Sequence, residues 1–292
     1  MLPNFFVVGV QKAATTSLHN YLIGHPEIYL PESKETKFFV DDLRYSKGIG
    51  FYRQTYFSDW KGEKAIGEID PDIIYFDYAA GRIGKHMDTA KIRLIISLRN
   101  PIDRAFSHYL MTHRRGLEPL CFEEAIAIEN RRIEKGYKEK MHYSYLTRGF
   151  YYQQIERLMT TTGNMEPFIM LSDDLKTNKE GALNAIFEYL DVATGFVPKN
   201  PNREYHQARI PRSTRLLNRV ISETPEKRLI RFLIPFKGLR HKIRQKLIAM
   251  NETEVHKMVL HPDTRKRLVE IYRRDNSRLE QFLHRDLSHW NA

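Results

Sequence analysis

Cysteine, long apolar runs and signal-peptide features are scarce or missing in this sequence. Cys121 is the only cysteine among 292 residues, which excludes an intrachain disulfide and a zinc site built from cysteines. No apolar run approaches the roughly 20 residues needed to cross a bilayer. The first four residues lack the basic start and the apolar core of a signal peptide. These absences predict a cytoplasmic protein.

Two kinds of catalytic pattern are missing as well. The twelve histidines show no metal-ligand spacing, since His108 and His113 are five residues apart and a helix brings residues four apart onto one face. No Gly-x-Ser-x-Gly elbow occurs, so nothing local indicates serine-hydrolase chemistry. We therefore expect no metal site.

Positive charge and apolar residues are plentiful. The formal net charge is +11, and 41% of the residues are hydrophobic. Such a charge predicts attraction to nucleic acid, acidic polysaccharide, anionic lipid or phosphorylated cofactors, without distinguishing among them. The length permits a full core, and we expect one domain over 1–292. Its nucleotide-binding α/β core would cover 1–200, with a basic loop and helices over 201–292.

The most informative stretch lies near the beginning of the sequence. Phe5–Val8 is a short apolar run that predicts a buried strand, and the run ends at Gly9. Leu18, Tyr21 and Leu22 then repeat at helical spacing. The pattern predicts a strand, a tight loop and a helix N-terminus.

The loop between that strand and that helix has the composition of an anion-binding site. Free N–H groups at a helix N-terminus carry partial positive charge. The hydroxyls of Thr15, Thr16 and Ser17 add donors, and Lys12 adds a full charge. A bound phosphate would be well accommodated there.

This loop departs from the nucleotide-triphosphate pattern G-x-x-x-x-G-K-[ST]. Counting from Gly9, Ala14 replaces the second glycine and Thr15 replaces the lysine, while the cation lies earlier, at Lys12. The segment resembles the 5′-phosphosulfate loop of sulfotransferases that use 3′-phosphoadenosine 5′-phosphosulfate (PAPS), with Lys12, Thr15 and Thr16 on matching positions. Another phosphate-loop enzyme and a structural turn remain alternatives for this segment alone.

A second stretch places charges next to paired aromatics. Glu35 precedes Phe38 and Phe39 with two residues between. By itself this pattern is typical of a solvated loop with an aromatic anchor. In the polysaccharide-modifying branch of the family, a Glu in this place is the catalytic base. The resemblance therefore implies that role for Glu35 and makes Lys34 and Lys37 candidate acceptor contacts.

Residues 64–69 predict another strand, and a helix is expected from 70 to about 87 because proline follows Asp70. The block resembles the family's Gly-Glu-x-x-Pro motif. Ile69 stands where some members carry a lysine that helps bind the donor or the acceptor. In this chain another cation, for example Lys37, would have to make that contact. Asp70 would cap the helix or contact an acceptor, and capping is the favoured interpretation.

A third block begins with the apolar strand 94–98 and continues into Arg99. Asn100 and Pro101 then predict a capped helix start. Ligands of open parallel sheets bind where strands end and helices begin. Ser107 lies about two turns into that helix, so a long arginine and a hydroxyl could share one dianion. Arg99 and Ser107 resemble the family's 3′-phosphate motif. The alternative is that Arg99 pairs with an acidic residue and Ser107 has no ligand.

Later segments carry weaker signals. Charged, helical sequence is expected from 115 to 140, and the block around Tyr151 and Gln154 resembles a largely architectural family motif. Arg212 lies in a polar loop where the family often closes basic residues over the 3′-phosphate. The basic helical segment 214–250 would be a solvated face, or a surface that gathers an anionic acceptor or contacts an anionic membrane.

Together these blocks identify the chain as similar to bacterial relatives of the polysaccharide sulfotransferases. The resemblance implies a parallel sheet with helices on both faces, a P-loop-like phosphate site and a C-terminal helical cap. It implies PAPS as donor, 3′,5′-adenosine bisphosphate as product, no metal, and a carbohydrate or glycan acceptor sulfated on a hydroxyl or an amine. A kinase or NTPase with an altered loop and a basic polyanion-binding protein are the alternatives. No nucleic-acid partner is expected, because basic and aromatic residues do not interleave.

Overall fold

The computed structural model describes residues 1–163, 165–198, 210–211, 252–253 and 258–291. The chain divides into two compact units. The first unit combines 1–105, 146–205 and 266–292, and the second combines 106–145 and 206–265.

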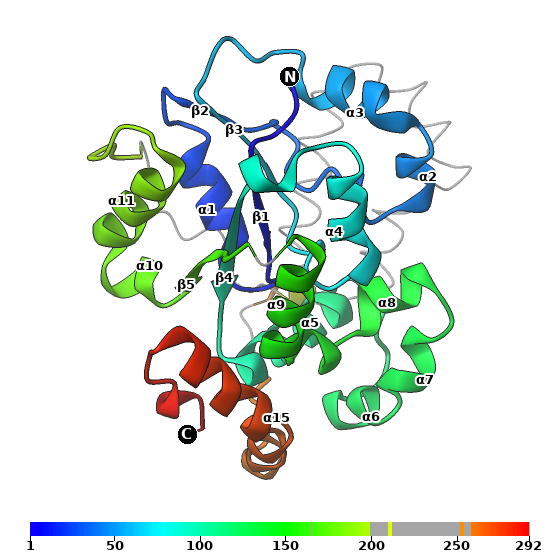
Figure 1. The fold of residues 1–292 in the computed structure, drawn as a ribbon. Coiled ribbons are helices and arrows are strands. Elements are labelled where there is room, and N and C mark those ends of the chain that lie inside the picture. Colours follow the sequence, from blue (N-terminus) through cyan, green and yellow to red (C-terminus); the bar gives the residue numbers. More distant parts are fainter. Residues whose placement is uncertain (164, 199–209, 212–251, 254–257, 292) are drawn as a thin grey trace. The chain divides into compact units, whose positions relative to one another are not determined.

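A parallel sheet of five strands forms the centre of the first unit (Figure 1). Its order is β2-β3-β1-β4-β5. The strands are β1 Phe5–Gly9, β2 Ile28–Tyr29, β3 Ala65–Ile69, β4 Arg93–Leu98 and β5 Phe168–Leu171. Strands of parallel sheets are covered on both faces and are therefore continuously apolar. This explains why the runs at 5–8, 64–69 and 94–98 predicted strands correctly.

Helices cover both faces of this sheet (Figure 1). Phe5 and Val7 point into a core shared with α1 and α11, whereas Val8 faces α4 and α9. The helices on the first face are α1 Thr15–Leu22, α10 Asp174–Thr177 and α11 Lys179–Leu190; those on the second are α4 Asp77–Gly84 and α9 Tyr151–Thr161. Each fully buried large apolar side chain contributes about 1.5–3 kcal/mol, so these layers hold the strand ends in place. The predicted α/β architecture is confirmed.

The prediction that a helix starts at Asp70 is wrong. Residues 71–76 form turns, and α4 begins only at Asp77 after the N-cap position Phe76. Asp70 accepts a hydrogen bond at 3.1 Å from the N–H of Asp72, which closes a turn and competes with helix formation. Asp70 is therefore not a helix cap, and its carboxylate belongs to the network described below.

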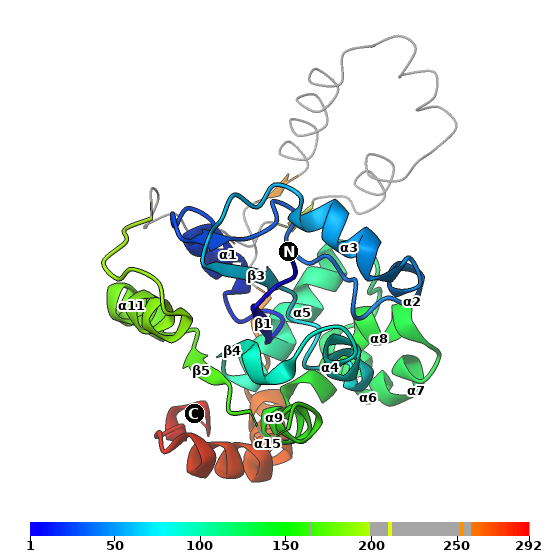
Figure 2. The same cartoon turned by 45° about the horizontal axis from the view of Figure 1, so that its top comes forward.

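Further α-helices of the first unit come from other parts of the chain. They are α2 Asp42–Tyr45, α3 Gly48–Phe57 and the part of α15 (Pro262–Leu283) from residue 266 onward. Figure 2 shows that part of α15 beside α9, where Asp275 accepts from the N–H of Tyr152 at 3.0 Å. The helix ends at Leu283 because His284 adopts a left-handed conformation, with φ of 49°.

The second unit contains the later part of α5 (Pro101–Arg114) and three short helices, α6 Phe122–Ala127, α7 Glu129–Ile133 and α8 Tyr137–Tyr143. The expectation of helix between 115 and 140 is thus confirmed from 122 onward, in three separate helices, whereas 115–121 form a turn and a loop. Buried Glu118 holds this unit together, since it pairs with Arg132 and accepts from the hydroxyl of Tyr145 at 2.9 Å. Strands β6 Ile210–Pro211 and β7 Glu252–Thr253 form an antiparallel pair.

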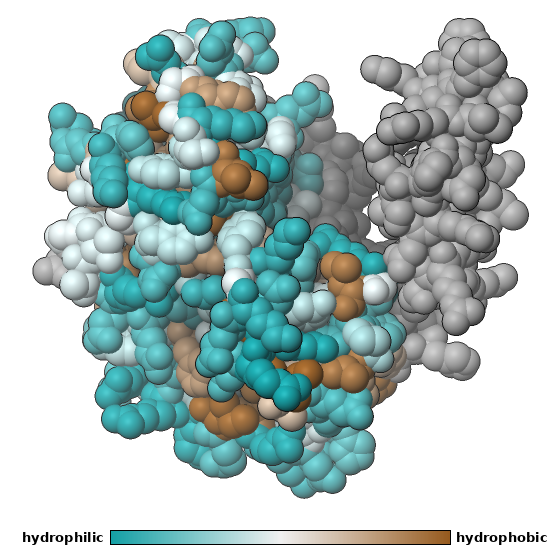
Figure 3. Space-filling view, turned by 90° about the vertical axis from the view of Figure 1, so that its right-hand side faces the viewer, coloured by the Kyte–Doolittle hydropathy of each residue, from teal (hydrophilic) through white to brown (hydrophobic). Residues whose placement is uncertain are grey.

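The face drawn in Figure 3 is mainly hydrophilic, with hydrophobic residues in small groups. Large apolar side chains that are exposed include Leu43, Val197 and Val259, which come from distant parts of the sequence. In the described part of the chain, no helix combines the length and the apolar character that a membrane span requires.

Candidate functional site

The loop Val10–Ala14, called the phosphate loop below, joins β1 to α1 and is held from one side by β4. Ser97 donates from its hydroxyl to the carbonyl oxygen of Ala13 at 2.7 Å, and Arg99 donates to the carbonyl oxygen of Lys12 at 3.3 Å. The N–H of Val10 also bonds to the carbonyl oxygen of Ser97 at 2.9 Å. These contacts draw the loop carbonyls toward β4, which suits a loop whose N–H groups serve a ligand.

The start of α1 has the geometry of an anion-binding helix terminus. Its N-cap residue, Ala14, is left-handed with φ of 61°, and no side chain caps the helix. The first N–H groups of a helix have no intrahelical acceptor, so an anion can take that place. Lys12 is left-handed too, with φ of 74°. Such backbone costs on the order of 1–3 kcal/mol per residue and clusters at functional sites.

The predicted donor residues are gathered around this terminus. Thr15 is buried, whereas Thr16, Ser17 and Lys12 are half-buried on the same loop and helix turn. Thr16 also accepts, through its carbonyl oxygen, a hydrogen bond from Asn20 at 2.8 Å. The structure therefore keeps all of them within one strand-loop-helix element, as the sequence predicted.

The end of β4 supplies the second predicted phosphate contact. Arg99 follows Leu98 directly and is half-buried. Asn100 caps α5, accepting from the N–H of Ile102 at 2.9 Å, and α5 begins at Pro101 as predicted. Ser107 lies further along α5, is half-buried, and falls in the second unit. Arg212 lies outside the described residues.

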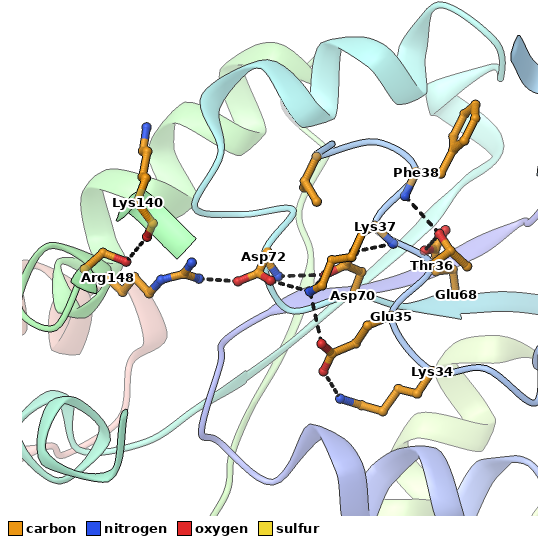
Figure 4. A network of polar contacts seen from close by, with 12 residues as sticks. Lys34, Glu35, Thr36, Lys37, Phe38, Glu68, Asp70, Asp72, Lys140 and Arg148 are labelled. Atoms are coloured by element: carbon orange, nitrogen blue, oxygen red, sulfur yellow. Dashed lines mark hydrogen bonds and ion pairs between the residues drawn. The ribbon is translucent and has the colours of Figure 1, made fainter. Parts of the chain in front are cut away.

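Charged side chains from three segments meet beside the loop 34–38 (Figure 4). The ammonium nitrogen of Lys37 lies 3.0 Å from Glu35 and 2.8 Å from Asp70, and it also pairs with Asp72. Lys34 pairs with Glu35. Arg148 approaches Asp72 from the side opposite Lys37 (Figure 4). We call these six side chains the carboxylate network.

The backbone of 35–37 is shaped to form this network. Glu35 and Lys37 are both left-handed, with φ of 64° and 58°. The N–H of Glu35 donates to the carbonyl oxygen of Ile69 at 3.1 Å, and the N–H of Lys37 donates to Asp70 at 3.2 Å. Since Ile69 ends β3, and β3 pairs with β1, this segment lies at the same sheet edge as the phosphate loop.

A second buried layer supports the segment from behind. Glu68 is 1% exposed and accepts hydrogen bonds from the hydroxyls of Thr36 and Tyr52. Burial, followed by the nearby charge of Asp70, raises the pKa of Glu68 to about 7, although the two hydroxyls and Lys37 act in the opposite direction. Glu68 is thus a carboxyl whose charge changes near neutral pH.

The network sets the charge states of its members. Burial favours the neutral form of Glu35, but the charges of Lys37 and Lys34 outweigh burial and lower its pKa. The pKa of Asp70 is raised, chiefly by burial. Asp72 is buried too, yet Lys37 and Arg148 hold its pKa well below the usual range. Glu35, about one third exposed, is therefore an ionised carboxylate able to accept a proton.

The three acids also have the spacing of a cation site. Single carboxylate oxygens of Glu35, Asp70 and Asp72 lie within 4.8 Å of one another. Lys37 places its ammonium group among all three, and the surrounding acids raise the pKa of that lysine although burial opposes the rise. The ammonium group of Lys37 thus supplies the positive charge between the three carboxylates. Ile69, which stands in the motif position of a family lysine, is 2% exposed in the core.

Sequence reasoning found part of this site and missed part. The structure brings together four residues that the sequence predicted: Lys34, Glu35, Lys37 and Asp70. The ion pair between Asp72 and Arg148 was not predicted. The spacing Glu68-x-Asp70-x-Asp72 at the end of a buried strand was an available signal, because Glu68 lies in β3, the two aspartates follow it, and such acids in a core need cationic partners. The supporting hydroxyls of Thr36 and Tyr52 gave no such signal. Tyr151 and Gln154 have structural contacts, as expected: Gln154 donates to two backbone carbonyl oxygens.

This geometry agrees with the comparison to known families. A family model described as the sulfotransferase domain matches residues 2–225, and the chain belongs to that family. The crystal structure of a sulfotransferase from Alicyclobacillus acidocaldarius aligns over 100% of both chains, with a TM-score of 0.70 and 26% sequence identity. The predicted family and the predicted fold are both confirmed.

Several sulfotransferases from other organisms are similar over part of their length. The membrane-associated sulfotransferase kil1 of Dictyostelium discoideum is 36% identical over 110 residues, covering 37% of this chain and 22% of the relative. The bifunctional heparan sulfate N-deacetylase/N-sulfotransferase 2 of Homo sapiens is 25% identical over 205 residues, covering 65% and 22%. The heparan sulfate glucosamine 3-O-sulfotransferase 5 of Mus musculus is 28% identical over 172 residues, covering 56% and 48%. The chain thus spans about a fifth to a half of these proteins.

Proposed function

We propose that this chain transfers a sulfuryl group from PAPS to a hydroxyl or an amine of a carbohydrate or glycan, leaving 3′,5′-adenosine bisphosphate. The observation that carries this proposal is the contact between its two anion-binding elements. Arg99 donates to the carbonyl oxygen of Lys12 at 3.3 Å, so the phosphate loop and the end of β4 adjoin. A nucleotide with phosphates on its 3′ and 5′ carbons would use both elements.

The residues at the phosphate loop fit such a donor. The uncapped start of α1 and the hydroxyls of Thr15, Thr16 and Ser17 would bind the 5′-phosphate oxygens. Arg99 and Ser107 would bind the 3′-phosphate, because charge-assisted bonds to a dianion are among the strongest that side chains form. Arg212 would add a cation to that phosphate.

The transfer breaks the bond between sulfur and the bridging oxygen of the donor and forms a bond from sulfur to the acceptor atom. Lys12 would offset the negative charge that builds on the bridging oxygen, the kind of electrostatic assistance that accounts for much of catalysis in related transfers. Glu35 would take the proton that the acceptor loses. The pKa of Glu35, lowered by Lys37 and Lys34 against the effect of burial, keeps it ionised for this role.

A donor-binding measurement tests the proposal directly. We expect the protein to bind 3′,5′-adenosine bisphosphate much more tightly than AMP, and we expect Arg99→Ala to narrow that gap, as measured by calorimetry. Equal affinities in the unchanged protein would reject the 3′-phosphate assignment. Cleavage of ATP with Mg²⁺ would instead support the altered-kinase alternative, and protection by RNA or DNA would support polyanion binding.

The acceptor class is supported by the relatives, whose names refer to heparan sulfate. Transfer from radiolabelled PAPS to sugar hydroxyls, sugar amines, lipid-linked glycans and small natural products would identify the acceptor. Labelling of a natural product alone would contradict a carbohydrate acceptor. Flotation with anionic vesicles at two salt concentrations would test whether the basic segment 214–250 contacts an anionic membrane, the alternative to a solvated face.

A further inference from the structure

The two residues that follow β4 are held from behind by distant parts of the first unit. Tyr151 donates from its hydroxyl to the carbonyl oxygen of Arg99 at 2.8 Å. The side-chain amide of Asn100 donates to the carbonyl oxygen of Trp290 at 3.2 Å. The same amide accepts, through its oxygen, from the N–H of Ile102. The backbone that presents Arg99 is therefore fixed at two successive residues.

Trp290 is placed to stabilise both attachments. Its side chain is 1% exposed, and its ring packs edge-on against Tyr151 with centroids 6.1 Å apart. The preceding residues are tied to the start of α10: Arg285 binds Asp174 through two nitrogens, at 2.8 and 2.5 Å. Asp174 in turn accepts a hydrogen bond at 2.9 Å from the N–H of Leu171, the last residue of β5. The segment 285–290 thus joins the ends of β4 and β5.

We propose that Trp290 is a positioning residue for nucleotide binding, which acts through Tyr151 and Asn100 to hold Arg99 in register with the 3′-phosphate. This inference rests on the proposed function, since it takes the 3′-phosphate of the donor as the ligand of Arg99. The physical reason is that a guanidinium binds a phosphate through two parallel bonds, which require a fixed direction. Small displacements of such groups cost large factors in binding or rate.

Calorimetry with 3′,5′-adenosine bisphosphate and with AMP tests the role of Trp290. In Trp290→Ala, we expect bisphosphate affinity to fall roughly tenfold, as when one charge-assisted bond is loosened, while AMP affinity stays unchanged. Trp290→Phe keeps an aromatic ring against Tyr151 and also removes an indole N–H that is buried without an acceptor among the described residues. This conservative variant should bind both ligands like the unchanged protein.

A second variant tests the link without removing the buried ring. Asn100→Ser keeps a helix-capping side chain, because serine caps about as well as asparagine, but it has no amide to donate to Trp290. Its bisphosphate affinity should also fall, with AMP affinity retained. Asn100→Ser therefore decides the question if Trp290→Ala does not fold.

The possible failures are distinguishable. If the unchanged protein does not discriminate bisphosphate from AMP, the proposed donor is wrong and the inference falls with it. If it discriminates and the variants keep the same affinity ratio, only the positioning role of Trp290 is overturned. An equal loss for both ligands would also overturn it, since that result indicates general destabilisation.

Discussion

The phosphate loop and the carboxylate network lie at the same edge of the sheet but are stabilised in different ways. At the phosphate loop, Ser97 and Arg99 bind backbone carbonyl oxygens, and the helix start is uncapped. In the carboxylate network, side chains bind side chains, and Lys37 contacts three carboxylates. The first arrangement leaves backbone donors for a ligand, whereas the second satisfies its charges internally.

This difference indicates how each region would respond to change. A backbone anion site depends on chain conformation, so a single side chain can be removed there at a cost mainly to ligand binding. A buried charge network is stable only when its negative and positive charges compensate one another. Here the three carboxylates pair with Lys34, Lys37 and Arg148. Removing one partner of such a network leaves an uncompensated buried charge. Changes to the network should therefore affect stability as well as activity.

The largest effect is expected from Glu35→Gln. Glutamine keeps the size and polarity of this side chain but cannot accept a proton, so turnover should fall roughly 10²- to 10⁴-fold while donor binding survives. Turnover with radiolabelled PAPS and calorimetry with the bisphosphate measure the two quantities. Lys34→Gln, which changes the ion-pair partner of Glu35, is the control and should cost less. Near-normal turnover of Glu35→Gln would place the base elsewhere.

The pH profile gives an independent check on the same residue. Glu35 must be ionised to act as a base, so activity should decline as pH falls through its pKa. Despite burial, Lys37 and Lys34 lower that pKa, so the midpoint of the decline should lie below the ordinary glutamate value of 4.5. Glu35→Gln should lack this limb of the profile.

Lys37→Met should have the next largest effect, and it should act on folding. Removal of the shared cation leaves the carboxylates of Asp70 and Asp72, each 1% exposed, with less compensation. Breaking a buried ion pair in this way costs about 3–5 kcal/mol of unfolding free energy, measurable by urea unfolding. Lys34→Met is the matched control, because Lys34 is similarly buried but pairs with Glu35 alone in the described residues. Equal losses in the two variants would contradict the central role of Lys37.

The sequence predicted the strand, loop and helix around the phosphate loop because these signals are local. Phe5–Val8, Gly9 and the hydroxyls after it form one contiguous strand-loop-helix, and Arg99 directly follows a strand. The anion-binding geometry then depends on backbone that these few residues determine. Ser107 and Arg212 remain predictions.

The carboxylate network could be predicted only in part because its partners are far apart in sequence. Arg148 lies 76 residues after Asp72, and a charge pattern does not reveal which distant cation a carboxylate will meet. The false helix start at Asp70 has the same origin. A proline after aspartate favours a helix locally, but the carboxylate of Asp70 binds Lys37 and the N–H of Asp72 instead. Tertiary contacts overrode a local preference.

Lys12→Ala tests the donor side with a smaller expected effect. Loss of this charge should lower turnover roughly 10²- to 10³-fold, the usual cost of removing one group that stabilises developing negative charge. Because the group acts on the donor, the loss should be the same with two unrelated acceptors. Unfolding free energy should change little compared with Lys37→Met. A loss confined to one acceptor would instead assign Lys12 to acceptor binding.

The smallest effect is expected from Glu68→Gln, and its pH dependence makes it specific. The pKa of Glu68 is raised from 4.5 to about 7, chiefly by burial, so between these values the folded protein holds a proton that the unfolded chain releases. Stability contributed by this group is therefore present at low pH and is lost as pH rises through about 7, by about 3 kcal/mol in total. Glutamine does not titrate and can still bond to the hydroxyls of Thr36 and Tyr52.

Thermal unfolding of the two proteins between pH 5 and pH 8 would measure this contribution. Glu68→Gln should match the unchanged protein near pH 5 and become the more stable of the two as pH rises. The same substitution at exposed Glu32 controls for the loss of one negative charge. If the stability difference between Glu68→Gln and the unchanged protein were constant from pH 5 to pH 8, Glu68 would keep one protonation state over this range. Asp70 and Lys37, the charged groups that face Glu68, would then set that state. The buried layer behind the 35–37 segment would then be fixed in charge, like the carboxylate network in front of it.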